Sequence, residues 1–198
     1  MSHGERVRIV DEKLLADDWA KLTKYTIDFR RRDGKVERQI RQVYNRGNGA
    51  GILPVDASRG TVLLVKQFRM PVYMNPPPGT AERGMLIEVC AGLLDENDPE
   101  TAIRKEAEEE LGYRLSSVHR VFDAYMSPGS VSERLSLFVA EYSPADRISA
   151  GGGAADEGED IEVLEMPLRE ALALVTGGAI VDAKTIMLLQ HAALKELA

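Results

Sequence analysis

A predicted helix with a strongly acidic face constrains this 198-residue chain more than any other feature. Asp98 suits the N-cap, Pro99 suits the first helical position and Gly112 suits the end, so the sequence predicts a helix over about 99–111. An apolar stripe runs along one side of this helix and consists of Ile103, Ala107 and Leu111. Such a stripe buries against a sheet, which makes this helix part of a mixed α and β fold.

Three carboxylates lie beside that stripe, because Glu106, Glu109 and Glu110 are spaced at i, i+3 and i+4. Like charges at these spacings destabilise a helix by about 0.2–0.5 kcal/mol per pair, unless a cation lies between them. Mg²⁺ accepts such oxygen ligands and completes its shell with waters and phosphate oxygens. The spacing therefore favours a metal site, and a solvated acidic helix face is the alternative.

The distribution of charge supports the same interpretation. The net charge of −7 resolves into two acidic patches, at 95–110 and 156–165, which carry −6 each and leave +5 for the remainder. The acid excess argues against nucleic-acid binding. A single cysteine, Cys90, excludes an internal disulfide and a multi-cysteine zinc site, and we expect it to be buried and inert.

The N-terminal residues predict a small β appendage. Residues 25–29 and 39–44 alternate apolar and polar side chains on either side of Asp33-Gly34, which is a hairpin signal. A lone hairpin is marginally stable in water, so this appendage would pack on the main domain or on a second subunit.

Strands and helices alternate through the rest of the chain, which indicates an α/β sandwich. The predicted strands are about Ile52–Val55, Thr61–Phe68, Met85–Cys90, Val118–Tyr125, Arg134–Tyr142 and Ile161–Leu164. The proline-rich segment 71–84 is a predicted loop, and the closing helices are about Leu168–Val175 and Ala183–Leu197. No apolar run approaches the ~18 residues of a membrane span, and the N-terminus lacks signal-peptide features, so we expect a cytoplasmic protein without membrane contact.

The segment Gly92–Tyr113 resembles the Nudix box, GX5EX7REUXEEXGU, and the match is tight from Lys105 onward. Asp98 replaces the first glutamate of the box, the spacer after it is one residue short, and Lys105 replaces the usual arginine. The three glutamates that the Nudix family uses for metal are intact.

Further segments extend the resemblance to the nucleotide-sugar pyrophosphatase branch, and most closely to GDP-mannose pyrophosphatases. They are Tyr44–Gly49, Gln67–Arg69, Ala91–Asp95, Tyr125–Gly129, Gly151–Gly153 and Glu159–Glu165. The resemblance implies a Nudix-type α/β/α sandwich over 47–198, with an N-terminal antiparallel β extension over 1–46 that forms a homodimer and contacts substrate. Loop residues 74–83 have no counterpart in the pattern.

The activity that this resemblance implies is Mg²⁺-dependent hydrolysis of GDP-mannose to GMP and mannose 1-phosphate, with Mn²⁺ as an alternative ion. ADP-ribose hydrolysis to AMP and ribose 5-phosphate is the alternative substrate reaction. A non-catalytic Nudix-fold sensor of nucleotide sugars is an alternative of another class, and the intact box acids count against it.

The resemblance also implies site residues. The metal ligands would be the carbonyl of Ala91 and the carboxylates of Glu106, Glu109, Glu110 and Glu159. Glu133 and Glu159 are candidates for the catalytic base, with a solvated loop acid as the alternative for Glu133.

Substrate contacts would come from a further set, namely Trp19, Arg41, Arg69, Gly92, Glu133 and Lys184. Arg69 would bind phosphate, for which a guanidinium fork is suited. Trp19 would stack on the base, or else serve as a core anchor. For Arg41 and Lys184 the alternative is a surface salt bridge.

Overall fold

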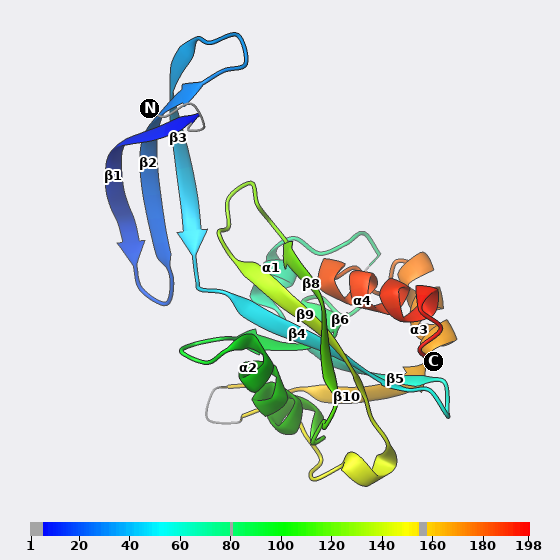
Figure 1. Ribbon diagram of the computed structural model, residues 1–198. Helices are drawn as coiled ribbons and strands as arrows, with labels where there is room; N and C mark the ends of the chain where they lie inside the picture. Colours follow the sequence, from blue (N-terminus) through cyan, green and yellow to red (C-terminus); the bar gives the residue numbers. More distant parts are fainter. Residues whose placement is uncertain (1–5, 80, 155–157) are drawn as a thin grey trace. The chain divides into compact units, whose positions relative to one another are not determined.

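The computed structural model describes residues 6–79, 81–154 and 158–198, so Asp156 and Glu157 of the second acidic patch lie outside the described residues. The chain divides into two compact units. The first comprises Met1–Asn48 and Tyr125–Arg134, and the second comprises Gly49–Ala124 and Leu135–Ala198. Figure 1 shows the elements of each unit.

The first unit is a three-stranded antiparallel sheet in the order β1-β2-β3. Its strands are β1 (Val7–Asp17), β2 (Lys21–Arg30) and β3 (Val36–Asn45). The predicted hairpin is confirmed, with Gly34 at φ 85° in its turn, while β1 was not predicted. Segment 125–134 joins this unit because the Tyr44 amide donates to the Ser130 carbonyl at 2.8 Å, and the Ser132 amide donates to the Tyr44 carbonyl at 3.1 Å.

The second unit contains a seven-stranded mixed sheet in the order β10-β5-β4-β9-β8, with β6 beside β5 and β7 beside β4. The β4–β9 pair is parallel, whereas the β4–β5, β4–β7, β5–β6 and β5–β10 pairs are antiparallel. The strands are β4 (Gly49–Asp56), β5 (Thr61–Phe68), β6 (Met85–Glu88), β7 (Cys90–Leu93), β8 (Val118–Tyr125), β9 (Arg134–Glu141) and β10 (Glu162–Pro167).

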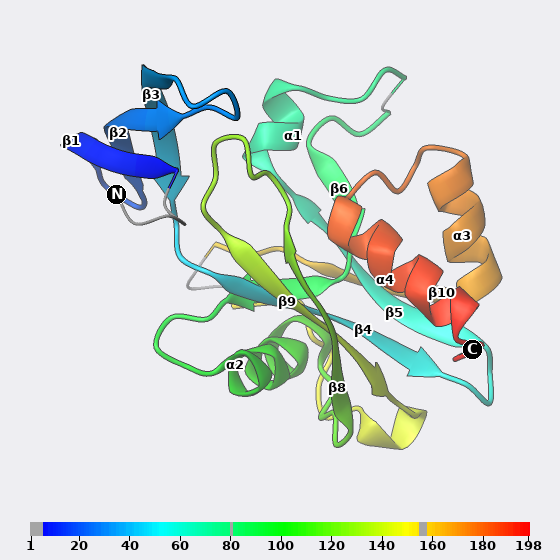
Figure 2. The same ribbon diagram turned by 45° about the horizontal axis from the view of Figure 1, so that its top comes forward.

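Helices cover both faces of this sheet (Figure 2), which confirms the predicted α/β/α class. Helix α2 (Pro99–Glu106) packs its stripe into one core cluster with Leu63 and Val65 of β5. Because strand residues alternate between faces, Val62 and Leu64 point to the other side. Helices α3 (Leu168–Thr176) and α4 (Ala183–Leu194) cover that face, where Leu188 and Leu189 are fully buried.

Two predicted elements differ from the structure. The sequence predicts one strand over 85–90 that ends at Ala91-Gly92. The structure has two strands instead: β6 pairs with β5 and ends before Val89, and β7 continues through Ala91-Gly92 and pairs with β4. The helix expected over 99–111 starts as predicted, with Asp98 Oδ1 accepting the Glu100 and Thr101 amides at 3.1 Å. It nevertheless becomes a π-helical turn, η1 (Ala107–Leu111), in which the Gly112 amide reaches back to the Ala107 carbonyl. Such turns are frequent at functional sites.

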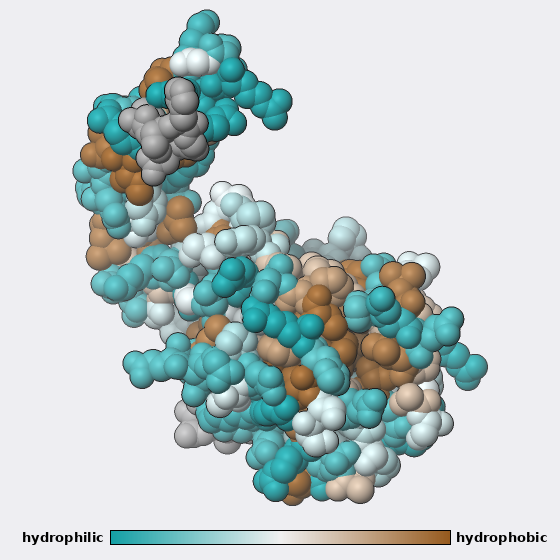
Figure 3. Space-filling model, in the orientation of Figure 1, coloured by the Kyte–Doolittle hydropathy of each residue, from teal (hydrophilic) through white to brown (hydrophobic). Residues whose placement is uncertain are grey.

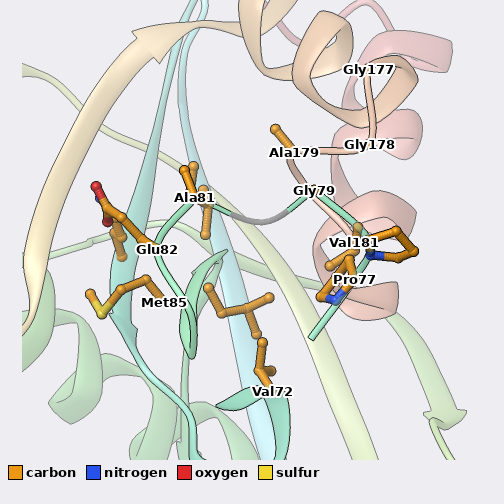
Figure 4. A pocket seen from close by; sticks show the side chains of 14 residues that line it. Val72, Pro77, Gly79, Ala81, Glu82, Met85, Gly177, Gly178, Ala179 and Val181 are labelled. Atoms are coloured by element: carbon orange, nitrogen blue, oxygen red, sulfur yellow. The ribbon is translucent and has the colours of Figure 1, made fainter. Parts of the chain in front are cut away.

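The proline-rich segment is a loop that begins with a short helix, α1 (Met70–Met74). Its Pro77, Gly79 and Ala81 lie across from Gly177–Val181, and together with β6 they line a pocket of about 390 Å³ (Figure 4). Among the helices in the described part of the chain, none is long and apolar enough to cross a membrane.

Candidate active site

Three acidic side chains of the second unit, Glu88, Glu106 and Glu159, act electrostatically on Glu110, which is 1% exposed at the π-helical turn. Its pKa is raised to about 8, chiefly by burial and further by the charges of Glu106, Glu159 and Glu88. A hydrogen bond with the Cys90 thiol opposes that shift. The negative potential at this point favours a cation, because a buried carboxylate ionises readily only beside a positive charge.

The Glu106 carboxylate lies in the space beside Gly92 that a larger side chain would fill. A Cβ atom on Gly92 would overlap the carboxylate of Glu106, so a larger residue at 92 would displace it. Glu110 Oε2 in turn accepts the Ala91 amide at 3.3 Å. Strand β7 therefore binds the Glu110 carboxylate through the Ala91 amide and leaves space for the Glu106 carboxylate at Gly92, where the box begins.

The second acidic patch reaches the box helix through the glycine-rich loop. The amides of Gly152 and Gly153 donate to the carbonyls of Glu110 and Glu109, at 2.9 and 3.1 Å. These carbonyls belong to the last helical turn, whose acceptors otherwise lack partners. The same loop positions Glu159, whose Oε2 accepts the Ala154 amide at 2.9 Å. Backbone hydrogen bonds thus join the glycine-rich loop to the end of the helix that carries Glu109 and Glu110.

Glu109 differs from the other predicted metal ligands. Its side chain is 41% exposed and lies 3.4 Å from Lys105 Nζ, whereas Glu110 is buried. The spacing i, i+3, i+4 assumes a regular α-helix, whereas the π-helical turn changes the angular positions of Glu109 and Glu110. The predicted acidic face is therefore centred on Glu110, with Glu106 from the helix and Glu159 from the loop.

The donor set fits a hard divalent cation. Within the described residues, no three His, Cys, Asp or Glu side chains are arranged closely enough to hold a metal ion by themselves. The acids do share one electrostatic environment, their donor atoms are all oxygens, and Gly92 leaves space for one of them. Mg²⁺ uses few protein ligands and retains several waters, so such an open arrangement suits it.

A buried ionic network adjoins these acids. Glu88 is 1% exposed, and its carboxylate accepts Arg69 Nε at 2.6 Å and the ammonium of Lys184. Asp182 lies 3.1 Å from Lys184 Nζ and caps helix α4. Burial alone would lower the pKa of Lys184, but Glu88 and Asp182 hold it above its usual value. The surface salt bridge considered for Lys184 is therefore wrong.

Sequence reasoning missed Glu88, although one signal was available. A glutamate in the otherwise apolar strand segment Met85–Cys90 requires a buried positive partner. Arg69 and Lys184, predicted separately as substrate contacts, both bind this carboxylate. Glu88 therefore brings together two basic residues that are far apart in the sequence.

The remaining predicted residues lie in the first unit. Glu133 is 8% exposed and accepts Arg46 Nε at 2.7 Å, so it is not the solvated loop acid that we considered. The Arg46 guanidinium also lies over the Trp19 ring, 5.9 Å from its centroid. Trp19 itself is 67% exposed, which rules out a core anchor. Arg41 donates to Gln39 Oε1 at 2.7 Å.

Two family models match the chain. The model described as "GDP-mannose pyrophosphatase NudK N-terminal domain" matches residues 6–44, and the NUDIX domain model matches residues 45–189. The chain is also similar to curated proteins named GDP-mannose pyrophosphatase. That of Pectobacterium atrosepticum is 54% identical over 189 residues, covering 96% of this chain and 95% of the relative. That of Cronobacter sakazakii is 49% identical over 189 residues, covering 96% of each. That of Yersinia pestis is 50% identical over 187 residues, covering 94% and 91%.

Proposed function

This chain belongs to the Nudix family, among the GDP-mannose pyrophosphatases, and from that premise we propose that it hydrolyses GDP-mannose to GMP and mannose 1-phosphate. The protein is a Nudix pyrophosphatase, and a divalent metal is general to that class. The observation that carries the proposal is identity of about half to curated GDP-mannose pyrophosphatases over nearly the whole chain.

The residues that would hold the cation follow from the site. Glu106, Glu110, Glu159 and the carbonyl of Ala91 are the proposed ligands, with Glu109 as an outer neighbour. Mg²⁺ is the expected ion and Mn²⁺ the alternative, since both accept oxygen ligands. A bound cation of this kind neutralises charge on phosphate oxygens and lowers the pKa of a bound water.

In the proposed reaction, a water oxygen attacks one phosphorus of the diphosphate and the bridging oxygen leaves with the other phosphate. A carboxylate accepts the proton of that water. Glu133, held by Arg46, is the first candidate for this base, and Glu159 is the second. The two roles are separable, because replacing a base lowers kcat at saturating Mg²⁺, whereas replacing a ligand raises the Mg²⁺ concentration needed for activity.

The substrate contacts are proposals of the same kind. Arg69 and Lys184 are suited to the phosphates, and the backbone at Gly92 borders the same acids. The exposed ring of Trp19 is suited to stacking on guanine, and Arg41 would contribute from the N-terminal sheet.

The deciding experiment incubates the purified protein and Mg²⁺ with GDP-mannose, ADP-ribose and other nucleotide sugars, and separates the products by chromatography. We expect GMP and mannose 1-phosphate, and no product after EDTA treatment. Preferential release of AMP from ADP-ribose would show that ADP-ribose, and not GDP-mannose, is the preferred substrate. Binding without release of any nucleoside monophosphate would support the sensor alternative and contradict the enzyme.

A matched pair of variants tests the proposed metal-binding carboxylates. Glu110→Gln should lower turnover by about two orders of magnitude or more, because it removes a buried ligand charge. Glu108→Gln is the control, since Glu108 pairs with Arg114 Nε at 2.9 Å on the exposed side of the same turn. Equal activity of the two variants would contradict the metal assignment.

We also propose that the protein is a homodimer, and the N-terminal sheet supports this. Residues directly opposite each other in paired strands share a face. Val7 opposes Phe29, Ile9 opposes Ile27, and Leu14 opposes Thr23, so apolar side chains gather on one face of the β1–β2 pair. Figure 3 shows apolar surface on this unit, where Val7, Ile9 and Leu14 are exposed.

The other face of the same sheet is charged, because Asp28 binds Arg8 and Arg38 there, at 2.5 and 2.9 Å. An exposed apolar face opposite a charged one is suited to a second copy of the chain. Ile9→Lys should therefore give a monomer by light scattering, whereas Lys13→Glu on the charged face should leave a dimer. A monomeric wild-type protein would contradict the proposal.

The cytoplasm is the proposed location. The only cysteine, Cys90, is buried and free, so the chain has no disulfide that would need an oxidising compartment. Fractionation of cells that express the protein tests this assignment.

A further inference from the structure

Gln67 carries a buried donor that has no hydrogen-bond partner among the described residues. Its residue is 6% exposed in strand β5, and Nε2 is the one buried side-chain nitrogen or oxygen of the described residues that has no hydrogen-bond partner. Buried polar groups in native proteins are nearly always satisfied, because an unpaired donor destabilises the fold. An exception at a candidate active site indicates a partner that arrives with a ligand.

The strand register places Gln67 on the face of the sheet that packs against the helix carrying Glu106 and Glu110. Val65 and Gln67 share a face because they are two residues apart. Val65 belongs to the core cluster of the box helix and lies directly opposite Glu88 in β6. Arg69 is two residues further along the chain and binds Glu88. Gln67 thus lies along the chain between Val65, which is opposite Glu88, and Arg69, which binds Glu88.

The carboxylates of this face already accept hydrogen bonds from other donors. Glu88 accepts Arg69 through Oε1 and Lys184 through Oε2, and Glu110 Oε2 accepts the Ala91 amide. An amide N–H cannot ligate a cation, because it has no lone pair to offer. No acceptor of the described residues pairs with Gln67 Nε2, so its partner is an acceptor outside them, next to a guanidinium that is suited to phosphate.

We propose that Gln67 Nε2 donates a hydrogen bond to a phosphate oxygen of the nucleotide diphosphate, beside Arg69. The inference deepens the proposed function and rests on it. Hydrogen bonds to charged oxygens are stronger than neutral ones. The unpaired donor thus weakens the free enzyme slightly and strengthens the complex.

Gln67→Met tests this, because methionine has a similar length and no donor. Loss of one hydrogen bond to a charged group should raise KM for GDP-mannose by about 10- to 100-fold, with a much smaller change in kcat. Removal of the unsatisfied donor should also raise the Tm of the free protein, by about 2–4 °C. Gln67→Glu should raise KM further, because a carboxylate repels the phosphate. Gln190→Met, on the exposed side of α4, is the control and should change neither value.

A binding measurement makes the test independent of catalysis. Imidodiphosphate with Mg²⁺ should raise the Tm of the wild-type protein, and this shift should be smaller in Gln67→Met. Unchanged KM together with a lower Tm would assign Gln67 a structural role and overturn the inference. A change confined to the Mg²⁺ concentration needed for activity would assign the donor to the water shell of the cation, which also overturns it. If the wild-type protein released no GMP, the proposed function would fail, and the imidodiphosphate shift alone would decide the role of Gln67.

Discussion

The carboxylate of Glu106 occupies the space that a side chain at Gly92 would need. The glycine thus permits one of the proposed ligands to approach strand β7 closely. The atoms that a Cβ would meet belong to the flexible end of Glu106, so a larger residue would move the carboxylate and leave the core intact.

Gly92→Ala should therefore separate activity from stability. Displacement of a ligand by about 1 Å can cost about 100-fold in rate, so we expect a loss of that order in kcat/KM. The Tm should change by only a few degrees. Gly129→Ala is the matched control, because a Cβ at Gly129 meets no atom within 4 Å. Similar activities of the two variants would show that the position of Glu106 is unimportant.

The glycine-rich loop allows a second comparison, between two glycines with similar positive φ values but different surroundings. Gly153 and Gly158 have φ values of 81° and 76°, so alanine is strained by about 1–2 kcal/mol at either position. A Cβ at Gly153 would lie 2.5 Å from Glu159 Oε2, whereas one at Gly158 meets nothing within 4 Å. Gly153→Ala should thus lose much more activity than Gly158→Ala in an assay of GMP release. Urea unfolding should show that the two variants lose similar amounts of stability. Parallel losses would mean that strain alone is responsible.

The buried carboxylate of Glu88 predicts a large effect on stability. Glu88→Gln would leave Arg69 and Lys184 without their shared negative partner, and breaking a buried ion pair costs about 3–5 kcal/mol. Glu82→Gln is the control, because Glu82 pairs with Lys66 at the surface and should cost less than about 1 kcal/mol. Urea unfolding measures both. A small effect of Glu88→Gln would show that the network is hydrated in solution.

Acid stability should depend on Asp56. Ser58 Oγ and Arg59 Nε donate to its carboxylate at 2.6 and 2.5 Å, and these bonds lower its pKa from 3.8 to about 2. A depressed folded-state pKa contributes stability that is complete above the ordinary value and is lost as pH falls toward the folded value. The stability difference between the wild type and Asp56→Asn should be constant above pH 4 and shrink between pH 4 and 2. Urea unfolding at a series of pH values tests this, and a constant difference would contradict it.

Local signals in the sequence were sufficient for much of the fold. Capping by Asp98, the hairpin at Asp33-Gly34 and the strand Thr61–Phe68 depend on residues close together in the chain, and the structure confirms each of them. Strand β1 was missed because its side chains are all exposed, so it lacks the one-sided burial from which strands are recognised.

The box motif alone determined that this chain is a Nudix hydrolase, because its glutamates and glycines are local in sequence. Only the tertiary structure decided which acids act together. At the π-helical turn Glu110 is buried while Glu109 is exposed, the glycine-rich loop positions Glu159 beside the helix end, and Glu88 binds both Arg69 and Lys184. These relationships depend on burial and on contacts between distant segments, which create the electrostatic environment of Glu110 and the unpaired amide of Gln67.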